Sequence, residues 1–539
     1  MACIEDGIEN IGFRKISAYI KSFHPDTKAA YVPTGNMRGI IRTLIGKGAG
    51  ELSESDIHMV AQFLAEGDLV GFSSMTQYSQ TVHKIIAELR DINPRAYIIW
   101  GGIHPIIDPN DAIMHADAIC TGEGEFAFKA FYDLFVNGKD YTTTPGFWFN
   151  TNSGVIKNPN LPLMQQNDMD GLPSLMYQDG ELIYERGKGF KTTVSKDFLE
   201  FMGLSYNTVW TVGCPLKCTY CGNSKFIEYD EAYRRLRHSS PRVIIEEIKR
   251  AISKHPYIST VHFYDDSFLS LPFKTLQEFA ELYKAEVKIP FAVSGIIPNY
   301  VKDDKMALLF DAGLNRVRMG IQSGSQRILD FYQRPTPLPR IHAAISIFNK
   351  YQKYMTPPVY DLILENPVET QDDTQQTLDL LHEIPRPFTL NIFALRVIPN
   401  TILAKDIAER GCSVPPINKS YHSEYQPTLG NVLVFAIVVW KIPRWLYDIL
   451  RKRVYPVREE QPHYPILLAF FRTAYLVKRA LGHLRIMDFS VFPGKASYVL
   501  WKLGVIQFWQ RFIFKRFQLP EGPRSPVSDA RITETPSGE

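Results

Sequence analysis

Short apolar strands alternate with amphipathic helices along most of this chain of 539 residues. No other feature restricts the fold as strongly. Between about residues 11 and 136 the helix Gln80–Arg90 places Val82, Ile85, Ile86 and Leu89 on one face. The predicted strands there are Ala29–Val32, Asp68–Phe72, Tyr97–Trp100 and Ala118–Cys120. With glycine at strand ends, this alternation predicts an open parallel α/β sheet of Rossmann-like (flavodoxin-like) type, which binds ligands at the strands' carboxyl ends.

A second series of strands and helices runs from Thr208 to about Arg410. Six strand–helix units predict a partial (β/α)6 barrel of the TIM type, whose active site would face the carboxyl ends of its strands. The predicted strands are Thr208–Val212, Thr260–Tyr264, Phe291–Val293, Arg316–Ile321, Val359–Leu364 and Leu390–Leu395.

The remaining segments set the expected domain boundaries. Residues 141–205, rich in Pro, Gly, Asn and Thr, are predicted to be a linker with one hairpin. Prolines break residues 411–520 into short helices, and the Pro-, Ser-, Thr- and Glu-rich tail 521–539 is expected to be disordered. The expected division is therefore 1–140, 141–205, 206–410, 411–520 and 521–539.

Three cysteines follow the first barrel strand in a C-x3-C-x2-C spacing, Cys214, Cys218 and Cys221. Thiolates are soft ligands for zinc and for iron–sulfur clusters. A closed zinc site normally needs four ligands, and the nearby His238 and His262 lack a second pair at zinc-finger spacing. Three thiolates on a four-iron cluster leave one iron open to bind a substrate. The spacing favours such a cluster, with zinc or coincidence as alternatives.

This motif resembles that of the radical S-adenosylmethionine superfamily, in which an aromatic residue precedes the last cysteine, as Tyr220 does here. The resemblance implies a [4Fe–4S] cluster on the three cysteines. Its open iron would chelate the amino and carboxylate groups of S-adenosylmethionine, which one electron would cleave to a 5′-deoxyadenosyl radical. The protein would orient these cofactors and exclude water.

Later segments resemble the superfamily's other contacts with S-adenosylmethionine. An acidic pair ends the second strand, where the methionine amino group is held, although an Asp pair can also cap a helix. The fourth strand and its loop resemble those that approach the ribose and carboxylate. Ser294 ends the third strand, where a plain turn residue is an equal alternative. The expected S-adenosylmethionine residues are Tyr220, Asp265, Asp266, Ser294, Gln322, Ser323 and Gly324.

Two loops depart from the superfamily pattern. Members often have G-x-P-G-E-T after the fifth strand and P-G-T after the sixth. Here Glu365, Val368 and Asn400 replace three of the glycines. Glycine permits close approach of the backbone, so cofactor or substrate contacts at these loops need not follow the family.

The first series resembles the cobalamin-binding domain that precedes the barrel in one large radical S-adenosylmethionine class. The alternative is a generic flavodoxin-like domain with glycine at its strand ends. The resemblance covers about residues 11–410 and makes 1–140 the cobalamin-binding domain. It implies cobalamin contacts at Gly71, Ser73, Ser74, Thr76, Gly101, Gly102, His104, Gly122, Glu123 and Gly124.

Two features qualify the cobalamin prediction. Asp56-Ile57-His58 is the only near match to the D-x-H-x-x-G loop whose histidine ligates cobalt from below. It follows Ser53, a plausible helix N-cap, so His58 is predicted to lie on a helix surface. Only Cys3-Ile4 remains to form a strand before the first helix, which would weaken the sheet.

The net charge of +3 conceals an uneven distribution. Residues 431–520 contain 15 Lys and Arg against 4 Asp and Glu, or +11, so the rest carries 3 − 11 = −8. Interleaved aromatic residues make this region typical of a helix in an anionic membrane interface, and equally of a helical cap over the barrel mouth. No nucleic-acid recognition module is visible, and nucleic acid is not expected as a partner.

No secretory signal is visible, and the longest apolar run, Val432–Trp440, is about half of the roughly 20 residues that a spanning helix needs. Six cysteines, three of them in one motif, do not form a disulfide pattern. These features predict a cytoplasmic protein, with peripheral contact to the inner membrane face as the alternative.

Together, these features predict a cobalamin-dependent radical S-adenosylmethionine enzyme. We expect it to methylate an unactivated carbon of a small hydrophobic or natural-product substrate, with an external electron donor. One alternative is a radical rearrangement or ring closure with the same cofactors. Another is a non-catalytic redox-sensing or membrane-docked protein. The sequence identifies no general acid or base.

Overall fold

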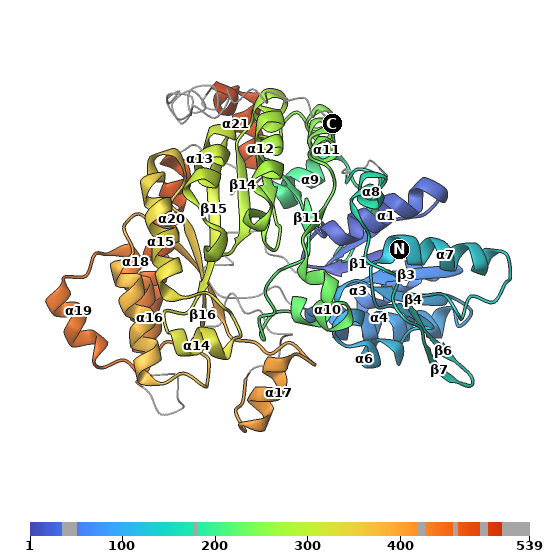
Figure 1. The fold of residues 1–539 in the computed structure, drawn as a ribbon. Helices are drawn as coiled ribbons and strands as arrows, with labels where there is room; N and C mark the ends of the chain where they lie inside the picture. The colour runs from blue at the N-terminus through green and yellow to red at the C-terminus, as the bar shows by residue number, and fades with distance from the viewer. Residues whose placement is uncertain are drawn as a thin grey trace, which may run out of the picture.

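The computed structural model describes residues 1–34, 51–175, 180–414, 417, 426–455, 462–485 and 494–508. Two α/β domains lie side by side, with the N-terminal domain at the right of Figure 1 and the barrel domain at its centre and left. The predicted tail 521–539 and the aromatic residues from Trp509 onward lie outside the described residues.

The N-terminal domain is built on a nine-stranded sheet. Its centre is parallel, as predicted, and its antiparallel additions β6, β7 and β9 come from the segment expected to be a linker. The order is β7(Gly154–Lys157), β6(Phe147–Thr151), β5(Ala118–Cys120), β4(Tyr97–Gly101), β3(Leu69–Ser73), β1(Ala2–Glu5), β2(Ala30–Pro33), β8(Leu182–Glu185) and β9(Gly189–Thr192). The segment 141–205 thus holds two hairpins, one at each edge of the sheet, and the short helices α8(Gln166–Asp170) and α9(Ser195–Met202).

The short first strand does not weaken this sheet. β1 lies between β2 and β3 and pairs in parallel with both. Ala2, Cys3 and Ile4 are completely buried. A central parallel strand is covered on both faces, so its side chains can all be apolar.

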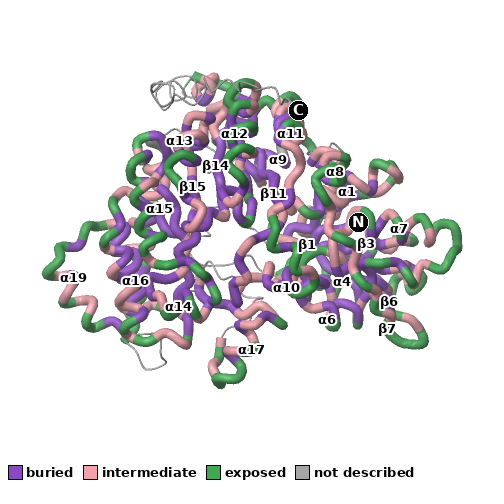
Figure 2. The backbone as a smooth tube through the Cα atoms, in the orientation of Figure 1, coloured by how far each residue is buried: buried purple, intermediate pink, exposed green. Residues whose placement is uncertain are grey.

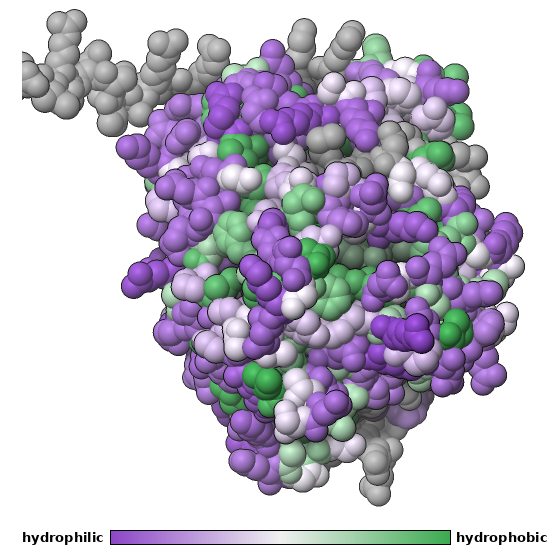
Figure 3. Space-filling view, turned by 90° about the vertical axis from the view of Figure 1, so that its right-hand side faces the viewer, coloured by the Kyte–Doolittle hydropathy of each residue, from purple (hydrophilic) through white to green (hydrophobic). Residues whose placement is uncertain are grey.

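Helices cover both faces of the N-terminal sheet (Figure 1). α1(Ile11–Phe23) and α7(Gly124–Val136) contact each other on one face, and α3(Glu54–Leu64) and α4(Ser79–Ile92) do so on the other. The predicted apolar face of α4 is confirmed, since Val82, Ile85, Ile86 and Leu89 are buried. Hydrophilic residues cover most of the face shown in Figure 3, with hydrophobic groups confined to small areas between them.

The barrel domain has six parallel strands, which confirms the predicted partial barrel. Their order is β10(Ser205–Thr208), β13(Thr260–Phe263), β14(Phe291–Ile296), β15(Leu314–Gln322), β16(Val359–Leu364) and β17(Thr389–Ala394). The outer helices are α11(Pro241–Lys254), α12(Phe273–Leu282), α13(Asp303–Ala312), α15(Leu338–Lys350) and α16(Gln371–Glu383). Buried residues concentrate along the strands in Figure 2.

The predicted first barrel strand is divided in two. β10 ends at Thr208, and β11(Thr211–Val212) leaves the barrel sheet to pair antiparallel with β12(Arg237–His238). This departure directs the chain away from the sheet immediately before Cys214.

The C-terminal region is helical, as predicted, with α18(Leu429–Val439), α19(Arg444–Arg451), α20(Pro465–Arg485) and α21(Gly494–Lys502). α18 is apolar on all sides and therefore packs between α16 and α20. The hydroxyl of Tyr475 on α20 donates to the carbonyl of Leu390, near the amino end of β17. In the described part of the region, the helices therefore support the side and amino end of the barrel. None of the described residues 426–508 lines the cavity at the carboxyl ends of the strands, so these helices are not a cap over it.

One face of α20 is exposed and apolar. Ile466, Phe470, Val477 and Leu481 recur at helical spacing, and Ile466 and Phe470 are 84% and 64% exposed. Among the helices that the structure describes, none is both long and apolar enough to cross a membrane.

Candidate functional site

A cavity of about 520 Å³ lies where the two α/β domains meet. The N-terminal domain lines it with the loop after β3 and with α5(Ile103–Ile107), through Thr76, Ile103 and Ile107. The barrel domain lines it with the cysteine loop and with the carboxyl ends of several strands. This is the end at which parallel α/β folds bind ligands.

The cysteine loop begins at Gly213, whose φ of 112° favours glycine. A Cβ there would lie 2.6 Å from the carbonyl oxygen of Arg235, so the loop packs too closely for a side chain. Cys214 and Cys218 are buried, and Cys221 lines the cavity. All three are free thiols. The motif therefore lies in the wall of the interdomain cavity.

The spacing of the thiols fits a cluster better than a single ion. Within the described residues, only His83, Asp111 and His115 bring three donor atoms within 4.8 Å of one another. At least two of the three cysteine sulfurs therefore lie more than 4.8 Å apart, which is further than two thiolates can be on one zinc ion with Zn–S bonds of about 2.3 Å. Burial raises the pKa of the Cys214 thiol to about 12, and coordination to a metal would deprotonate it.

Arg334, on the loop after α14(Gln326–Phe331), is a buried cation beside the cysteine motif. Its Nη1 lies 3.7 Å from Cys218 Sγ and 3.4 Å from the Tyr220 hydroxyl, and its Nη2 donates to the Gly320 carbonyl at 2.8 Å. Arg334 therefore places a buried positive charge beside Cys218 Sγ. Arg334 could not be predicted from the sequence, because nothing in its local sequence separates it from a surface arginine.

The predicted acidic pair performs two different tasks. Asp265 is buried and accepts hydrogen bonds from the backbone N–H of Thr211 at 2.5 Å and of Trp210 at 3.4 Å. It therefore holds β11 in place, and burial raises its pKa to about 6. Asp266 lines the cavity, where desolvation raises its pKa to about 6 against the opposing effect of a hydrogen bond with the Asn223 side chain. Neither side chain caps a helix in the described hydrogen bonds.

The other residues predicted to contact S-adenosylmethionine also divide into two groups. Gln322 and Ser294 line the cavity, where Ser294 Oγ lies 2.8 Å from His262 Nε2. Ser323 and Gly324 instead face α16. Thr377 Oγ1 on that helix accepts the Gly324 N–H at 3.0 Å. A Cβ on Gly324 would lie 2.6 Å from Thr377 Cα. The Ser-Gly loop therefore positions the end of β15.

The carboxyl edge of the N-terminal sheet holds several predicted cobalamin residues, including Ser73 and Gly101. Trp100 Nε1 donates to Ser74 Oγ at 3.0 Å. Gly102 has φ 88°, and its Cβ would lie 3.0 Å from the Ser74 backbone. This glycine thus lets α5 pack against the loop after β3. Thr76 lines the cavity with a buried hydroxyl that has no hydrogen-bond partner in the described part of the chain, which fits a polar ligand there.

Of the ten predicted cobalamin residues, only Thr76 lines this cavity. His104 is buried, with its Nε2 2.9 Å from Asp111 Oδ2. Glu123 Oε1 pairs with Arg237 Nη2 at 2.7 Å. Gly122 and Gly124, on either side of Glu123 after β5, do not line the cavity either.

Gly71 and His58 lie elsewhere in the N-terminal domain. Gly71 is inside β3. His58 lies on the surface of α3, as predicted, with Nδ1 2.5 Å from Glu88 Oε1. Ser53 is the N-cap of this helix, as predicted.

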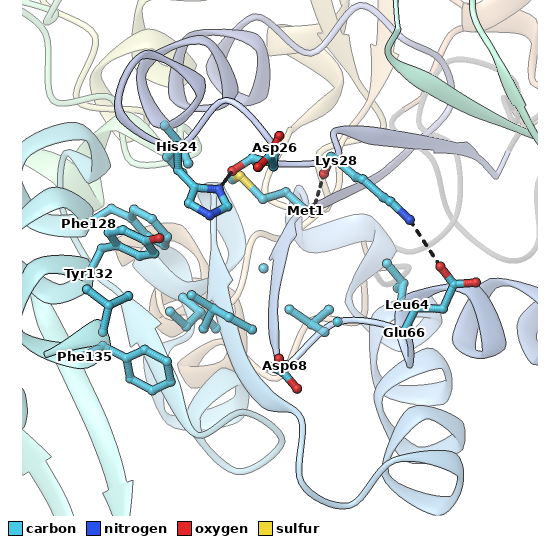
Figure 4. A pocket seen from close by; sticks show the side chains of 18 of the residues that line it. Met1, His24, Asp26, Lys28, Leu64, Glu66, Asp68, Phe128, Tyr132 and Phe135 are labelled. Carbon is cyan, nitrogen blue, oxygen red and sulfur yellow. Dashed lines mark hydrogen bonds and ion pairs between the residues drawn. The ribbon is translucent and has the colours of Figure 1, made fainter. Parts of the chain in front are cut away.

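A second cavity, of about 470 Å³, lies at the amino ends of the N-terminal strands and includes Gly71. Figure 4 shows Met1, His24, Lys28 and Asp68 around it. Its Lys28 pairs with Glu66 at 3.2 Å. No cysteine lines this cavity. The interdomain cavity is therefore the candidate active site.

Two of the replaced glycines keep a glycine-like backbone. Glu365 and Asn400 have φ of 62° and 61°. Asn400 Nδ2 donates to the Ile107 carbonyl of the N-terminal domain at 3.2 Å. Glu365 Oε1 accepts from the Gln426 N–H at 2.6 Å and from Asn431 Nδ2 at 3.0 Å. These side chains join parts of the molecule, and neither is among the residues that line the cavity.

Two family matches cover the domains that build the cavity. Residues 208–381 match the Radical SAM superfamily, and residues 52–132 match the B12 binding domain. These matches confirm the two resemblances and the cofactor classes that the sequence predicts.

Curated relatives are similar over more than half of the chain. An uncharacterised methyltransferase of Pyrococcus horikoshii is 25% identical over 61% of this chain and 67% of its own length. An anaerobic magnesium-protoporphyrin IX monomethyl ester cyclase of Rubrivivax gelatinosus is 23% identical over 66% of this chain and 60% of its own length. A bacteriochlorophyllide d C-8(2)-methyltransferase of Chlorobaculum tepidum is 24% identical over 53% of this chain and 56% of its own length.

Two solved structures share the fold. The radical S-adenosylmethionine methyltransferase TsrM of Kitasatospora setae, with tryptophan and an S-adenosylmethionine analogue, superposes with a TM-score of 0.59 at 14% identity, covering 88% of this chain and 95% of that one. The cobalamin-dependent S-adenosylmethionine radical enzyme OxsB superposes with a TM-score of 0.59 at 13% identity, covering 96% of this chain and 78% of that one. This chain therefore shares its overall fold with both.

Proposed function

We propose that this chain, whose two α/β domains match the Radical SAM superfamily and the B12 binding domain, is an enzyme that methylates an unactivated carbon of a small hydrophobic or natural-product substrate. One observation carries this proposal. The cysteine motif and the carboxyl edge of the N-terminal sheet line the same cavity. A radical source and a methyl carrier on opposite walls of one cavity can act on one substrate between them.

The cofactors would supply a carbon-centred radical and a transferable methyl group, and the chain's own residues would hold and orient them. Cys214, Cys218 and Cys221 would hold the cluster. Asp266 would accept a hydrogen bond from the methionine amino group, since this residue lines the cavity.

On the opposite wall, Thr76 would bind a polar edge of cobalamin through its hydroxyl, which has no hydrogen-bond partner among the described residues. Ile103 and Ile107 would contact the apolar part of the ligand and exclude water.

A ring closure or rearrangement with the same cofactors is the second candidate. The relative from Rubrivivax gelatinosus, named as a cyclase, favours it. The two reactions differ in one product: methyl transfer consumes a second S-adenosylmethionine and releases S-adenosylhomocysteine, whereas ring closure does not.

Product analysis of the anaerobically reconstituted protein tests the proposal. The protein is loaded with cluster and cobalamin, reduced, and supplied with S-adenosylmethionine carrying a trideuteromethyl group and with extracts of candidate substrates. Methyl transfer predicts 5′-deoxyadenosine, S-adenosylhomocysteine and a product that carries the label.

Other outcomes select the alternatives. 5′-Deoxyadenosine without S-adenosylhomocysteine would support ring closure or rearrangement. A stable cluster that never cleaves S-adenosylmethionine would support the non-catalytic redox or membrane-docked protein and would overturn the enzymatic proposal.

We further propose peripheral contact with an anionic membrane through the C-terminal region. The exposed apolar face of α20 supports it, together with the charge of +11 between residues 431 and 520. Apolar side chains on one helix face and nearby lysine and arginine are the features of interfacial helices.

A further inference from the structure

Arg396 stands out among the charged groups of the interdomain cavity. It follows β17 at the carboxyl end of the barrel and belongs to the cavity wall, although it is only 7% exposed. Its Nη1 donates to the carbonyl of the preceding residue, Leu395, at 2.9 Å. Its buried Nε has no acceptor in the described part of the chain.

Another arginine that lines the cavity, Arg318, has an acidic partner. Arg318 Nε donates to Asp361 Oδ1 at 2.7 Å, and its guanidinium lies 5.7 Å from the centre of the Phe393 ring. Asp361 also accepts from Asn391 Nδ2 at 3.1 Å. The charge of Arg318 is therefore compensated within the protein.

Among the described residues, no carboxylate forms an ion pair with Arg396. The acidic residue that influences it, Glu365, directs Oε1 to Gln426 and Asn431 instead. An arginine cannot lose its proton at ordinary pH, so a buried guanidinium without an anion is costly.

We propose that Arg396 binds an oxyanion of the substrate, a carboxylate or a phosphate. A guanidinium fork matches either group through two parallel hydrogen bonds. The surrounding wall is apolar, with Ile363, Phe393 and Ile398. The substrate is therefore amphipathic, with an apolar body and one anionic group. This inference rests on the proposed function, because it places the substrate in the same cavity.

Direct binding to the holoenzyme tests this assignment. The protein loaded with cluster, cobalamin and S-adenosylmethionine is titrated calorimetrically, under anaerobic conditions, with phenylacetate, phenyl phosphate and the neutral phenylacetamide. We expect one or both anions to bind and the amide not to bind. Arg396→Gln should weaken anion binding by about tenfold or more, because it removes charge-assisted hydrogen bonds.

Two further variants serve as controls. Arg396→Lys should restore part of the anion binding, since it restores the charge but not the fork. Arg340→Gln, at an exposed position on α15, should bind the anions as the wild type does. The affinity for S-adenosylmethionine and the cobalamin content should be the same in all variants.

Three results would overturn the proposal. In the first, Arg396→Gln binds the anions as tightly as the wild type. In the second, the wild type binds neither anion. In the third, the variant loses S-adenosylmethionine or cobalamin instead, which would assign Arg396 to a cofactor anion. Cleavage of S-adenosylmethionine by the same preparation reports on the proposed enzymatic function separately.

Discussion

Cys218 is the residue at which the cluster assignment can be tested most simply. Its thiol is buried and lies beside Arg334. Cys218→Ala should abolish the cluster's visible absorbance and the cleavage of S-adenosylmethionine, because the remaining two thiolates cannot hold the cluster stably. Iron content and 5′-deoxyadenosine formation are the measurements.

The matched control is Cys412→Ala, which removes a free cysteine outside the motif. This variant should retain both the cluster and the cleavage. Full iron content in Cys218→Ala would contradict the assignment of Cys218 as a ligand.

Asp56 makes the stability of the N-terminal domain depend on pH. Burial raises its pKa, but hydrogen bonds from Tyr184, Ser53 and Gly187 outweigh that effect and lower the pKa to about 2. The folded pKa lies below the unfolded value of about 3.9, so this contribution is full above that value and is lost as the pH falls toward 2.

Asp56→Asn should therefore lower the free energy of unfolding at pH 7 by about 1–3 kcal/mol, because it breaks hydrogen bonds to a charged group. Denaturant unfolding at pH 7 and below pH 4 measures the difference, which should shrink at the lower pH. An equal difference at both pH values would show that the charge of Asp56 is not the cause.

Single residues differed in how far the sequence could place them. Cys214, Cys218 and Cys221 were predictable because their spacing is local. Arg334 was not, because it reaches Cys218 across 116 residues of sequence. His104 follows a glycine pair at a strand end, but it lies in α5 with its side chain directed to Asp111, and side-chain direction is not encoded in that spacing.

At the scale of elements, the contact between the β15 loop and α16 depends on Gly324. A Cβ there would lie 2.6 Å from Thr377 Cα, which belongs to the backbone and cannot rotate away. Gly324→Ala should lower the free energy of unfolding by about 1–3 kcal/mol. It should also weaken S-adenosylmethionine binding, because the shift would displace the adjoining Gln322.

Thermal unfolding and equilibrium dialysis are the measurements for this variant. Gly12→Ala, in α1, is the matched control, since its Cβ would lie 3.5 Å from the Asn10 side chain and meet no closer atom. Unchanged stability in Gly324→Ala would mean that α16 can move away at little cost.

The existence and order of the strands followed from hydrophobic patterning, and the predicted 359–364 matches β16 as observed. The strands of segment 141–205 could not be predicted from this patterning. They are short and lie at the edges of the sheet, where some of their pairing partners come from elsewhere in the chain. The composition of residues 431–520 predicted helices, but it did not show that α18 would lie between α16 and α20.

At the scale of the whole molecule, the membrane proposal makes a direct prediction. The protein should float with vesicles that contain phosphatidylglycerol and remain behind with vesicles of phosphatidylcholine alone. Phe470→Glu and Val477→Glu on α20 should reduce flotation, because they place negative charge on its exposed apolar face.

Met114→Glu is the control, since Met114 is also an exposed apolar residue but lies in the N-terminal domain. Equal flotation of the α20 variants and the wild type, or none with either lipid, would refute the membrane contact.

The way in which the two α/β domains pack against each other could not be predicted from the sequence pattern. Each domain was predictable from its own periodicity, but their relative placement depends on contacts such as the one from Asn400 to the Ile107 carbonyl. The common cavity is a property of that placement.

The central claim is that one cavity brings cobalamin and the cluster together. Electron paramagnetic resonance of the anaerobic holoenzyme, with cobalamin as cob(II)alamin and the cluster reduced, tests it most directly. We expect a cob(II)alamin signal that is split or broadened by the nearby cluster spin and that sharpens in Cys218→Ala. An unperturbed cob(II)alamin signal in the fully loaded wild type would contradict it.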